Sequence, residues 1–159
     1  MTATSSPRTV SSRRLLYAAA ALAYVVAGVH LFHPSHGFGR LVTLLLVDPS
    51  LLVTDPRPVA FVLSGLAVLV GVPAVVAGFP RRAAYALGAG LAATYLVGYF
   101  AWHLSGHGGF LPGRKPLYHG MTPVEAVVAH LTGEPLAAVA VVTELAFLSV
   151  LVVLYRRDA

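Results

Sequence analysis

The amino-acid sequence predicts an all-α fold, a four-helix transmembrane bundle, on three observations. Hydrophobic residues make up 57% of the 159 residues, whereas charged residues make up only 11%. A water-soluble domain of this size needs many more charged residues on its exterior, and a lipid-facing exterior needs none. Four apolar segments are long enough to cross a bilayer as helices, and pairs of arginines lie beside them.

The four predicted spans cover residues 15–32, 58–79, 83–104 and 135–155. Charge, proline or glycine bounds each of them. The first would extend about 27 Å as a helix, which is close to the thickness of the hydrocarbon core. Together the spans form one membrane domain, residues 13–157. The preceding residues 1–12 are rich in serine and threonine, and we expect them to be a disordered cytoplasmic tail.

The positions of the paired arginines predict the orientation of the bundle. The pairs are Arg13 and Arg14, Arg81 and Arg82, and Arg156 and Arg157. With four alternating spans all three pairs fall on one side, and basic residues favour the cytoplasmic side. The sequence therefore predicts a multi-pass protein of the cell membrane with both termini in the cytoplasm. Residues 12–16 also resemble a twin-arginine export signal, but the three spans that follow favour a first membrane helix.

Each of the two outer connections is expected to contain a short interfacial helix. Residues 41–47 form an apolar run that is too short to cross a bilayer and too apolar to stay in water. In the second connection, Thr122, Pro123 and Glu125 have the pattern of an N-cap, a first-turn proline and a capping-box acid. The predicted helix ends at Gly133.

The histidines are the main candidates for chemistry, because the predicted topology places all seven of them on the outer side. His30 and His33 are three residues apart, and His103 and His107 would share a helical face if the third span continues, so each pair could bind one ion. The candidate metal ligands are His30, His33, His36, His103, His107 and His119. The chain has no cysteine, so copper or zinc would be held by imidazole, carboxylate or backbone oxygen.

Two other interpretations of the histidines stay open. His30 and His103 should lie at similar depth, so they could instead ligate a haem between the first and third spans. Alternatively, the histidines only keep the outer loops wet or bond to neighbouring helices. The chain has no zinc-protease spacing and no nucleophile with an adjacent base, so the sequence leaves open whether it is an enzyme.

Glu144 lies near the middle of the fourth span with apolar neighbours on both sides. An ionisable group at that depth costs several kcal/mol unless it is neutral, paired or wet, so it should face the interior of the bundle. One interpretation is a proton or quinone contact. The other is a protonated acid that is hydrogen-bonded to Thr94, Tyr95 or Ser64.

Two stretches resemble a known family. Residues 23–34, AYVVAGVHLFHP, and residues 63–66, LSGL, running on to the arginine pair and the third span, are similar to the DoxX-type family of small four-span membrane proteins. The resemblance covers roughly residues 23–99. It implies a compact bundle, and some relatives are similar to subunits of quinone-linked sulfur oxidoreductases. It assigns no catalytic residue.

These observations predict a membrane-bound redox or metal-handling accessory protein. Its outer histidines would hold a metal or haem, and the bundle would contact lipid together with a quinone, a partner redox subunit or a second copy. The alternative is a non-catalytic membrane subunit or small permease with structural histidines. The net charge of +5 follows from the arginine pairs and forms no basic stripe interleaved with aromatics, so no nucleic-acid partner is predicted.

Overall fold

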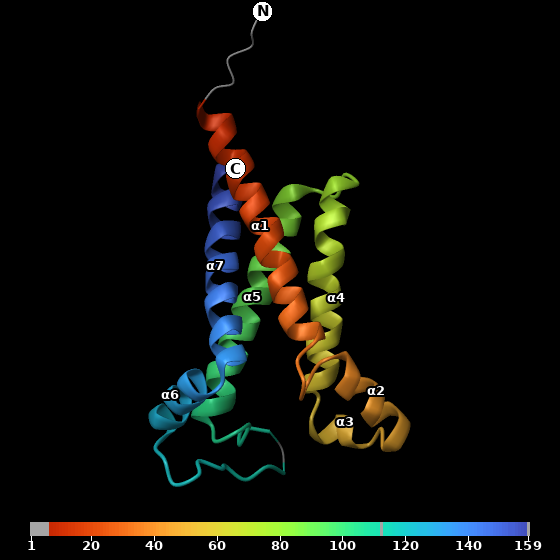
Figure 1. Cartoon of the computed structure of the whole chain (residues 1–159), viewed down its shortest axis with the longest axis vertical. Coiled ribbons are helices and arrows are strands. Elements are labelled where there is room, and N and C mark those ends of the chain that lie inside the picture. The colour runs from red at the N-terminus through yellow and green to blue at the C-terminus, as the bar shows by residue number, and fades with distance from the viewer. Residues whose placement is uncertain (1–6, 112, 159) are drawn as a thin grey trace, which may run out of the picture.

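The computed structural model describes residues 7–111 and 113–158, with side chains from residue 13 onward, and this part of the chain is all-helical. The helices are α1 (Pro7–Leu31), α2 (Phe38–Val47), α3 (Leu51–Thr54), α4 (Arg57–Val76), α5 (Arg81–Leu104), α6 (Pro123–Gly133) and α7 (Pro135–Arg157). Four of them are long, and the three short ones lie in the connections between them (Figure 1). The predicted fold class is therefore confirmed.

The four long helices match the predicted spans with small shifts at their ends. The segments long and apolar enough to cross a membrane are Arg13–Leu31, Arg57–Val76, Arg81–Leu104 and Pro135–Arg157. The helix α4 ends three residues before the predicted limit of 79, where Gly78 adopts a left-handed φ of 105°. The expected tail 1–12 is wrong for residues 7–12, because α1 begins at Pro7; residues 1–6 lie outside the described part.

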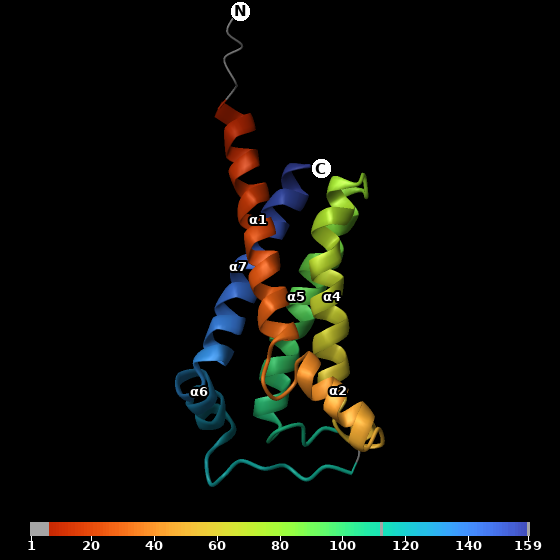
Figure 2. The same cartoon turned by 45° about the vertical axis from the view of Figure 1, so that its right-hand side comes forward.

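The two ends of the bundle differ in composition. The start of α1, the end of α7 and the connection between α4 and α5 lie at one end, which we call the terminal end (Figures 1 and 2). The short helices α2, α3 and α6 and the two longer connections lie at the opposite end, which we call the histidine end because the histidines gather there. The arrangement is the one that four alternating spans require.

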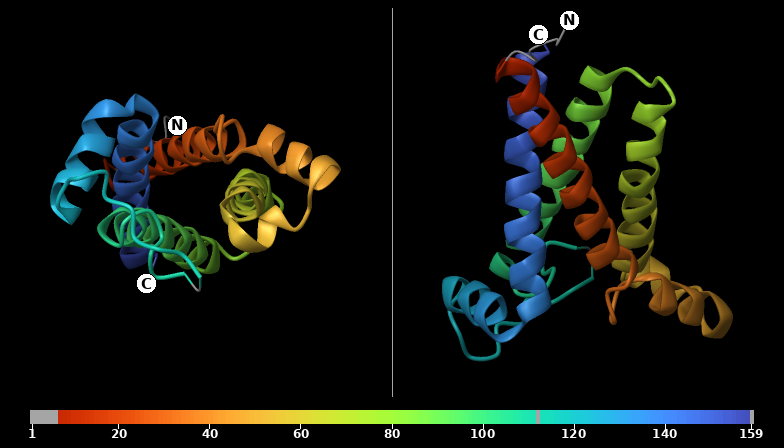
Figure 3. Two further views of the ribbon diagram at one scale, coloured as in Figure 1. Left: turned by 90° about the horizontal axis from the view of Figure 1, so that it is seen from below. Right: turned by 45° about the horizontal axis from the view of Figure 1, so that its top comes forward.

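The helix α1 joins the bundle together. It packs against α4 on one side and α7 on the other, and α5 packs against α7, whereas α4 and α5 contact each other less. Viewed along the bundle from the histidine end, α4 and α7 lie on opposite sides of the cross-section, and α1 and α5 lie between them (Figure 3).

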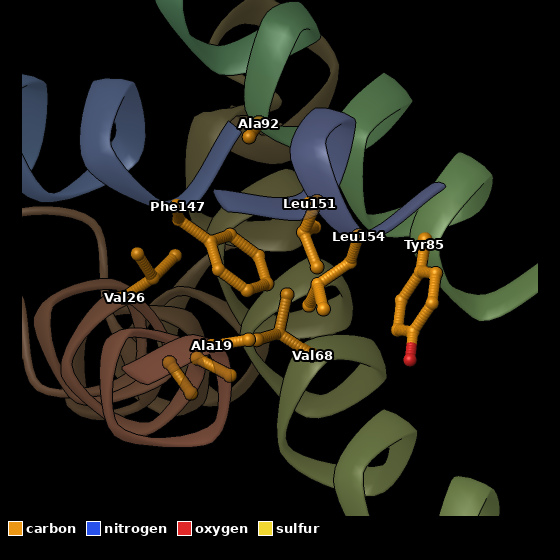
Figure 4. Close-up of a cluster of buried hydrophobic side chains, with 10 residues drawn as sticks. Ala19, Val26, Val68, Tyr85, Ala92, Phe147, Leu151 and Leu154 are labelled. Atoms are coloured by element: carbon orange, nitrogen blue, oxygen red, sulfur yellow. The ribbon is translucent and has the colours of Figure 1, made fainter. Parts of the chain in front are cut away.

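Small residues on α1 allow the close approach of α7. Ala19, Ala23 and Ala27 are buried in the main hydrophobic cluster. Figure 4 shows Ala19 in this cluster together with Phe147 and Leu151 of α7. Close approach of this kind is how helices associate in lipid, where apolar burial alone supplies no driving force.

The outward surface of the long helices is apolar. Side chains that are each at least 60% exposed include Leu63 and Val70 on α4, Leu87 and Val97 on α5, and Val142 on α7. In water such a surface would drive aggregation, whereas in hydrocarbon it is the expected exterior. Composition, helix length and surface therefore agree on a membrane protein.

Gly65 on α4 sets the distance between α4 and the end of α1. A Cβ atom at this position would lie 2.8 Å from Cγ of Leu31 and 3.3 Å from Cβ of His30. Gly71, on the same helix, has no such neighbour within 4 Å. The two glycines therefore form a matched pair for testing the packing.

We expect Gly65→Ala to lower the free energy of unfolding by about 1–3 kcal/mol, because the added methyl forces α1 and α4 apart. Gly71→Ala should change it by less than about 1 kcal/mol, because the methyl meets open space and alanine favours helix. Unfolding of both variants in detergent, followed by circular dichroism, measures the difference. Equal stability of the two variants would contradict this packing.

Candidate functional site

Three histidines from separate segments come together at the histidine end. His103 lies in the last turn of α5, His107 in the loop that follows, and His130 in α6. One potential ligand atom from each lies within 4.8 Å of the others, and Nε2 of His107 is 2.9 Å from Nε2 of His130. Within residues 13–111 and 113–158, this is the group of three with the spacing of a metal site. We call it the three-histidine group.

Each ring of the three-histidine group is anchored through Nδ1. The acceptors are the carbonyl oxygen of Tyr99 for His103 at 2.9 Å, the carbonyl oxygen of Leu117 for His107 at 2.7 Å, and Oε1 of Glu134 for His130 at 2.8 Å. A carbonyl oxygen only accepts, so Nδ1 carries the hydrogen in at least the first two rings. The Nε2 atoms therefore point toward one another rather than to backbone carbonyls, which is the usual arrangement of metal-binding histidines with oriented rings.

The short contact between His107 and His130 needs something between the two nitrogens. With hydrogen on both Nδ1 atoms, two Nε2 lone pairs face each other at 2.9 Å. That contact is repulsive unless a proton or a cation lies between them. Two imidazoles on one zinc ion, each with a Zn–N bond of about 2.0–2.1 Å, have nitrogens about 3.3 Å apart in a tetrahedron. A metal ion would therefore require little movement of these two rings.

The loop after α5 brings His107 back toward α6. The helix stops at Leu104, and Gly106, His107 and Gly108 all adopt left-handed φ values of 69°, 57° and 83°. A side chain at Gly108 would overlap the ring of Trp102, so glycine is required there for both backbone and space. The expectation that His103 and His107 share a continuing helical face is wrong, although their ring centroids still lie 5.5 Å apart.

Two arginines hold the same loop from outside. Arg114 donates to the carbonyl oxygen of His107 at 3.1 Å, and its guanidinium lies 4.9 Å from the ring of Trp102. Arg57, at the start of α4, lies 3.8 Å from that ring and also pairs with Asp55. The Trp102 ring thus links the two connections at the histidine end through cation–π contacts.

The predicted capping box positions α6 and with it His130. The backbone N–H of Thr122 donates to Oε2 of Glu125 at 2.8 Å, and the N–H of Glu125 donates to Oγ1 of Thr122 at 3.3 Å. The backbone N–H and the hydroxyl of Thr122 both donate to the Glu125 carboxylate, and these two bonds hold the pKa of Glu125 below its ordinary value. His130 is not among the ligands predicted from the sequence. Its spacing of four from Glu134, at the end of a capped helix, is the signal that points to it.

His30 has a different partner from the other histidines. It is 2% exposed, and its Nε2 lies 3.3 Å from Oε1 of Glu144, which is 3% exposed. Its Nδ1 lies 2.8 Å from the carbonyl oxygen of Val26. Glu144 therefore faces the interior as predicted, and its partner is a histidine from the end of α1.

The hydroxyl groups proposed as partners of Glu144 bond elsewhere. Thr94 donates to the carbonyl oxygen of Gly90 at 2.8 Å, Tyr95 to that of Ala60 at 3.0 Å, and Ser64 to that of Phe61 at 3.0 Å. The close contact of Glu144 in the described part of the chain is with His30, at 3.3 Å. Backbone carbonyls within or between the helices already satisfy these hydroxyls.

Aromatic rings fix the orientation of His30. The ring centroid of Tyr95 lies 4.1 Å from that of His30, and the ring centroid of Phe61 lies 4.8 Å away. Because both nitrogens of His30 have protein partners, a haem held by His30 and His103 would first have to displace Glu144.

His33 and His36 form a separate pair just beyond α1. Their Nδ1 atoms are 3.3 Å apart, and Nδ1 of His33 also accepts the backbone N–H of Ser35 at 3.2 Å. Nδ1 of His33 is thus an acceptor, unlike Nδ1 in the three-histidine group. Burial lowers the pKa of both, with Arg57 adding to the effect, and the pKa of His36 is about 4. The pair is neutral at pH 7 and presents no convergent set of three nitrogens.

His119, the remaining candidate ligand, is exposed at a left-handed φ of 53°. Its ring centroid lies 5.1 Å from that of His107. It is therefore a neighbour of the three-histidine group on the solvent side.

The fold and surface define this chain as a helical membrane protein with four helices long and apolar enough to span a bilayer. No protein-family model, curated protein or solved structure matches it. The resemblance to the DoxX-type family therefore stays a prediction, and function has to be argued from the geometry of the chain itself.

The lowered pKa of His36 makes the stability of the protein depend on pH. Its folded-state pKa of about 4 lies below the unfolded value of 6.5, so between these values the unfolded chain binds more protons. Stability should therefore fall as the pH falls through this window.

We expect His36→Gln to show a shallower loss of stability from about pH 6.5 to about pH 4, because the group that takes up the proton on unfolding is gone. His119→Asn, at an exposed position whose backbone asparagine tolerates, is the matched control and should keep the parent slope. Unfolding in detergent over this pH range measures both slopes. An unchanged slope in His36→Gln would contradict the burial of this ring.

Proposed function

We propose that the chain is a membrane metal-handling protein that binds one zinc or copper(II) ion at His103, His107 and His130. The observation that carries the proposal is the anchoring of all three rings through Nδ1, with ligand atoms within 4.8 Å of one another. Three oriented imidazoles are a sufficient first set of ligands for either ion.

The ligand chemistry narrows the choice of ion. Imidazole nitrogen suits zinc, copper(II) and nickel, whereas calcium and magnesium require oxygen ligands. The chain has no cysteine, so it cannot provide the thiolate ligands that copper(I) prefers. Copper(II) would make the site redox-active, which fits the predicted quinone or partner subunit.

Three protein ligands leave a further coordination position. Closed structural zinc sites use four protein ligands, while sites with three keep one position for water or an exchanging ligand. All three histidines are partly exposed, so an ion there can be reached from the solvent. These two features support a site that binds and exchanges its ion, rather than a closed site whose ion only stabilises the fold.

The proposal also places the histidine end outside the cell and the termini in the cytoplasm. The arginine pairs that flank α5 and α7 at the terminal end support this orientation. Because the chain lacks cysteine, single cysteines introduced at either end report on it without background.

We expect Ser35→Cys, at the histidine end, to react with a membrane-impermeant maleimide in intact cells. Phe79→Cys, in the exposed connection between α4 and α5, should react only after the cells are opened. The labelled fraction is read by gel shift. Labelling of Phe79→Cys alone in intact cells would reverse the orientation and contradict the proposal.

The metal site is tested by titrating the purified, metal-free protein with zinc or copper(II) in detergent. We expect one ion per chain, and loss of binding in His107→Ala and His130→Ala. Glu134→Gln should keep the stoichiometry but lower the affinity about 10–100-fold, because it weakens the acceptor that orients His130. His36→Ala, outside the three-histidine group, is the matched control and should bind as the parent does.

The alternative, a membrane subunit or small permease with structural histidines, rests on the same contacts. A shared proton between His107 and His130 would join the loop to α6 without any metal. In that case the parent protein binds no ion in the titration, and His107→Ala and His130→Ala only lower the unfolding temperature. The single titration therefore separates the two functions.

A further inference from the structure

We infer that His30 and Glu144 form a proton-binding site inside the bundle, and that this site exchanges protons with the histidine end only. The inference is independent of the metal site, because it rests on different residues at the interface of α1 and α7.

The contacts of His30 fix the number of protons that the pair can share. The carbonyl oxygen of Val26, 2.8 Å from Nδ1, only accepts, so Nδ1 carries a hydrogen. The 3.3 Å contact between Nε2 of His30 and Oε1 of Glu144 then holds one further proton, on the nitrogen or on the carboxyl group. Both forms leave the pair neutral in total. Neutrality explains how two side chains only 3% and 4% exposed persist in a membrane bundle.

Few ionisable groups surround the pair. His33 lies just beyond α1. Tyr95 comes from α5, with its ring 4.1 Å from that of His30 and its hydroxyl donating to a carbonyl oxygen of α4. The residues of α4 beside His30 are Phe61 and Gly65, and neither has a side chain that titrates. On α7, the residues one turn from Glu144 are the buried Val141 and Phe147. His33 is thus the group that can relay a proton.

The two sides of the pair are chemically different. Toward the histidine end lie His33 and then His36, both partly exposed. The Glu134 carboxylate, at the N-cap of α7, favours the protonated form of His33 by electrostatic attraction. Toward the terminal end lies the apolar cluster, which contains Val26 of α1 with Phe147 and Leu151 of α7 (Figure 4). Protons move through water and titratable groups, not through packed hydrocarbon. Access is therefore from one side.

Proton occupancy would also act on the packing of the helices. A second proton would leave the pair with a net positive charge and no Nε2–carboxylate attraction, and loss of the shared proton would leave a net negative charge. Either change adds an uncompensated charge at the contact of α1 with α7. The site thus couples external proton concentration to the fit of these two helices.

The test uses the full-length, metal-free protein in vesicles with one orientation, labelled with ¹³C-glutamate. Infrared difference spectra are recorded while the pH on one side is stepped from about pH 8 to about pH 5 and the other side is buffered. We expect a carboxyl signal that responds to a step at the histidine end, does not respond to a step at the terminal end, and is missing in Glu144→Gln. Glu125→Gln, which removes an exposed acid outside the pathway and keeps a side chain able to cap α6, should retain it.

His30→Gln provides the second arm. Glutamine keeps a hydrogen-bonding side chain but cannot take up the shared proton, so the Glu144 signal should remain in one form over the whole pH range. If this variant does not fold, isotope-labelled parent protein alone still decides the question. A buried carboxyl signal that follows the terminal side, follows both sides, or does not respond to either step would overturn the inference.

Discussion

The absence of hydrogen-bonding partners in hydrocarbon is the constraint on which this structure depends. It explains why the long helices expose leucine and valine, such as Leu63 and Val97, and why hydroxyls such as that of Thr94 bond to nearby carbonyl oxygens. It also explains the position of the histidines. Imidazoles lie either at one end of the bundle, where water can reach them, or in a neutral pair with Glu144.

The histidines use their ring nitrogens in three ways. In the three-histidine group Nδ1 is bound to oxygen and Nε2 faces the other rings, whereas Nδ1 of His33 accepts a backbone hydrogen bond. His30 uses both nitrogens within the protein. Residue type and spacing alone therefore do not separate a ligand from a packing residue; the partner of the second nitrogen does.

Much of the fold could be predicted from the sequence, because span length, arginine pairs and the Thr122 capping box act locally or through the bilayer. The two candidate sites are harder to predict from the sequence, because each joins residues that are far apart in the chain. The pairing of His30 with Glu144 joins the end of α1 to the middle of α7, and no local pattern encodes it. His130 was missed because it joins His103 and His107 only after the loop turns back through left-handed residues, a path that helix periodicity does not predict.

The left-handed backbone at His107 affects the rates at which an ion would bind to and dissociate from the three-histidine group. A non-glycine residue at a φ of 57° is held there by its surroundings, here by Arg114 and by the packing of Gly108 on Trp102. The unfavourable conformation is therefore already present before an ion arrives. Association and release would require only ring adjustments and water exchange, so residence time at this site would be governed by ligand chemistry rather than by rearrangement of the loop.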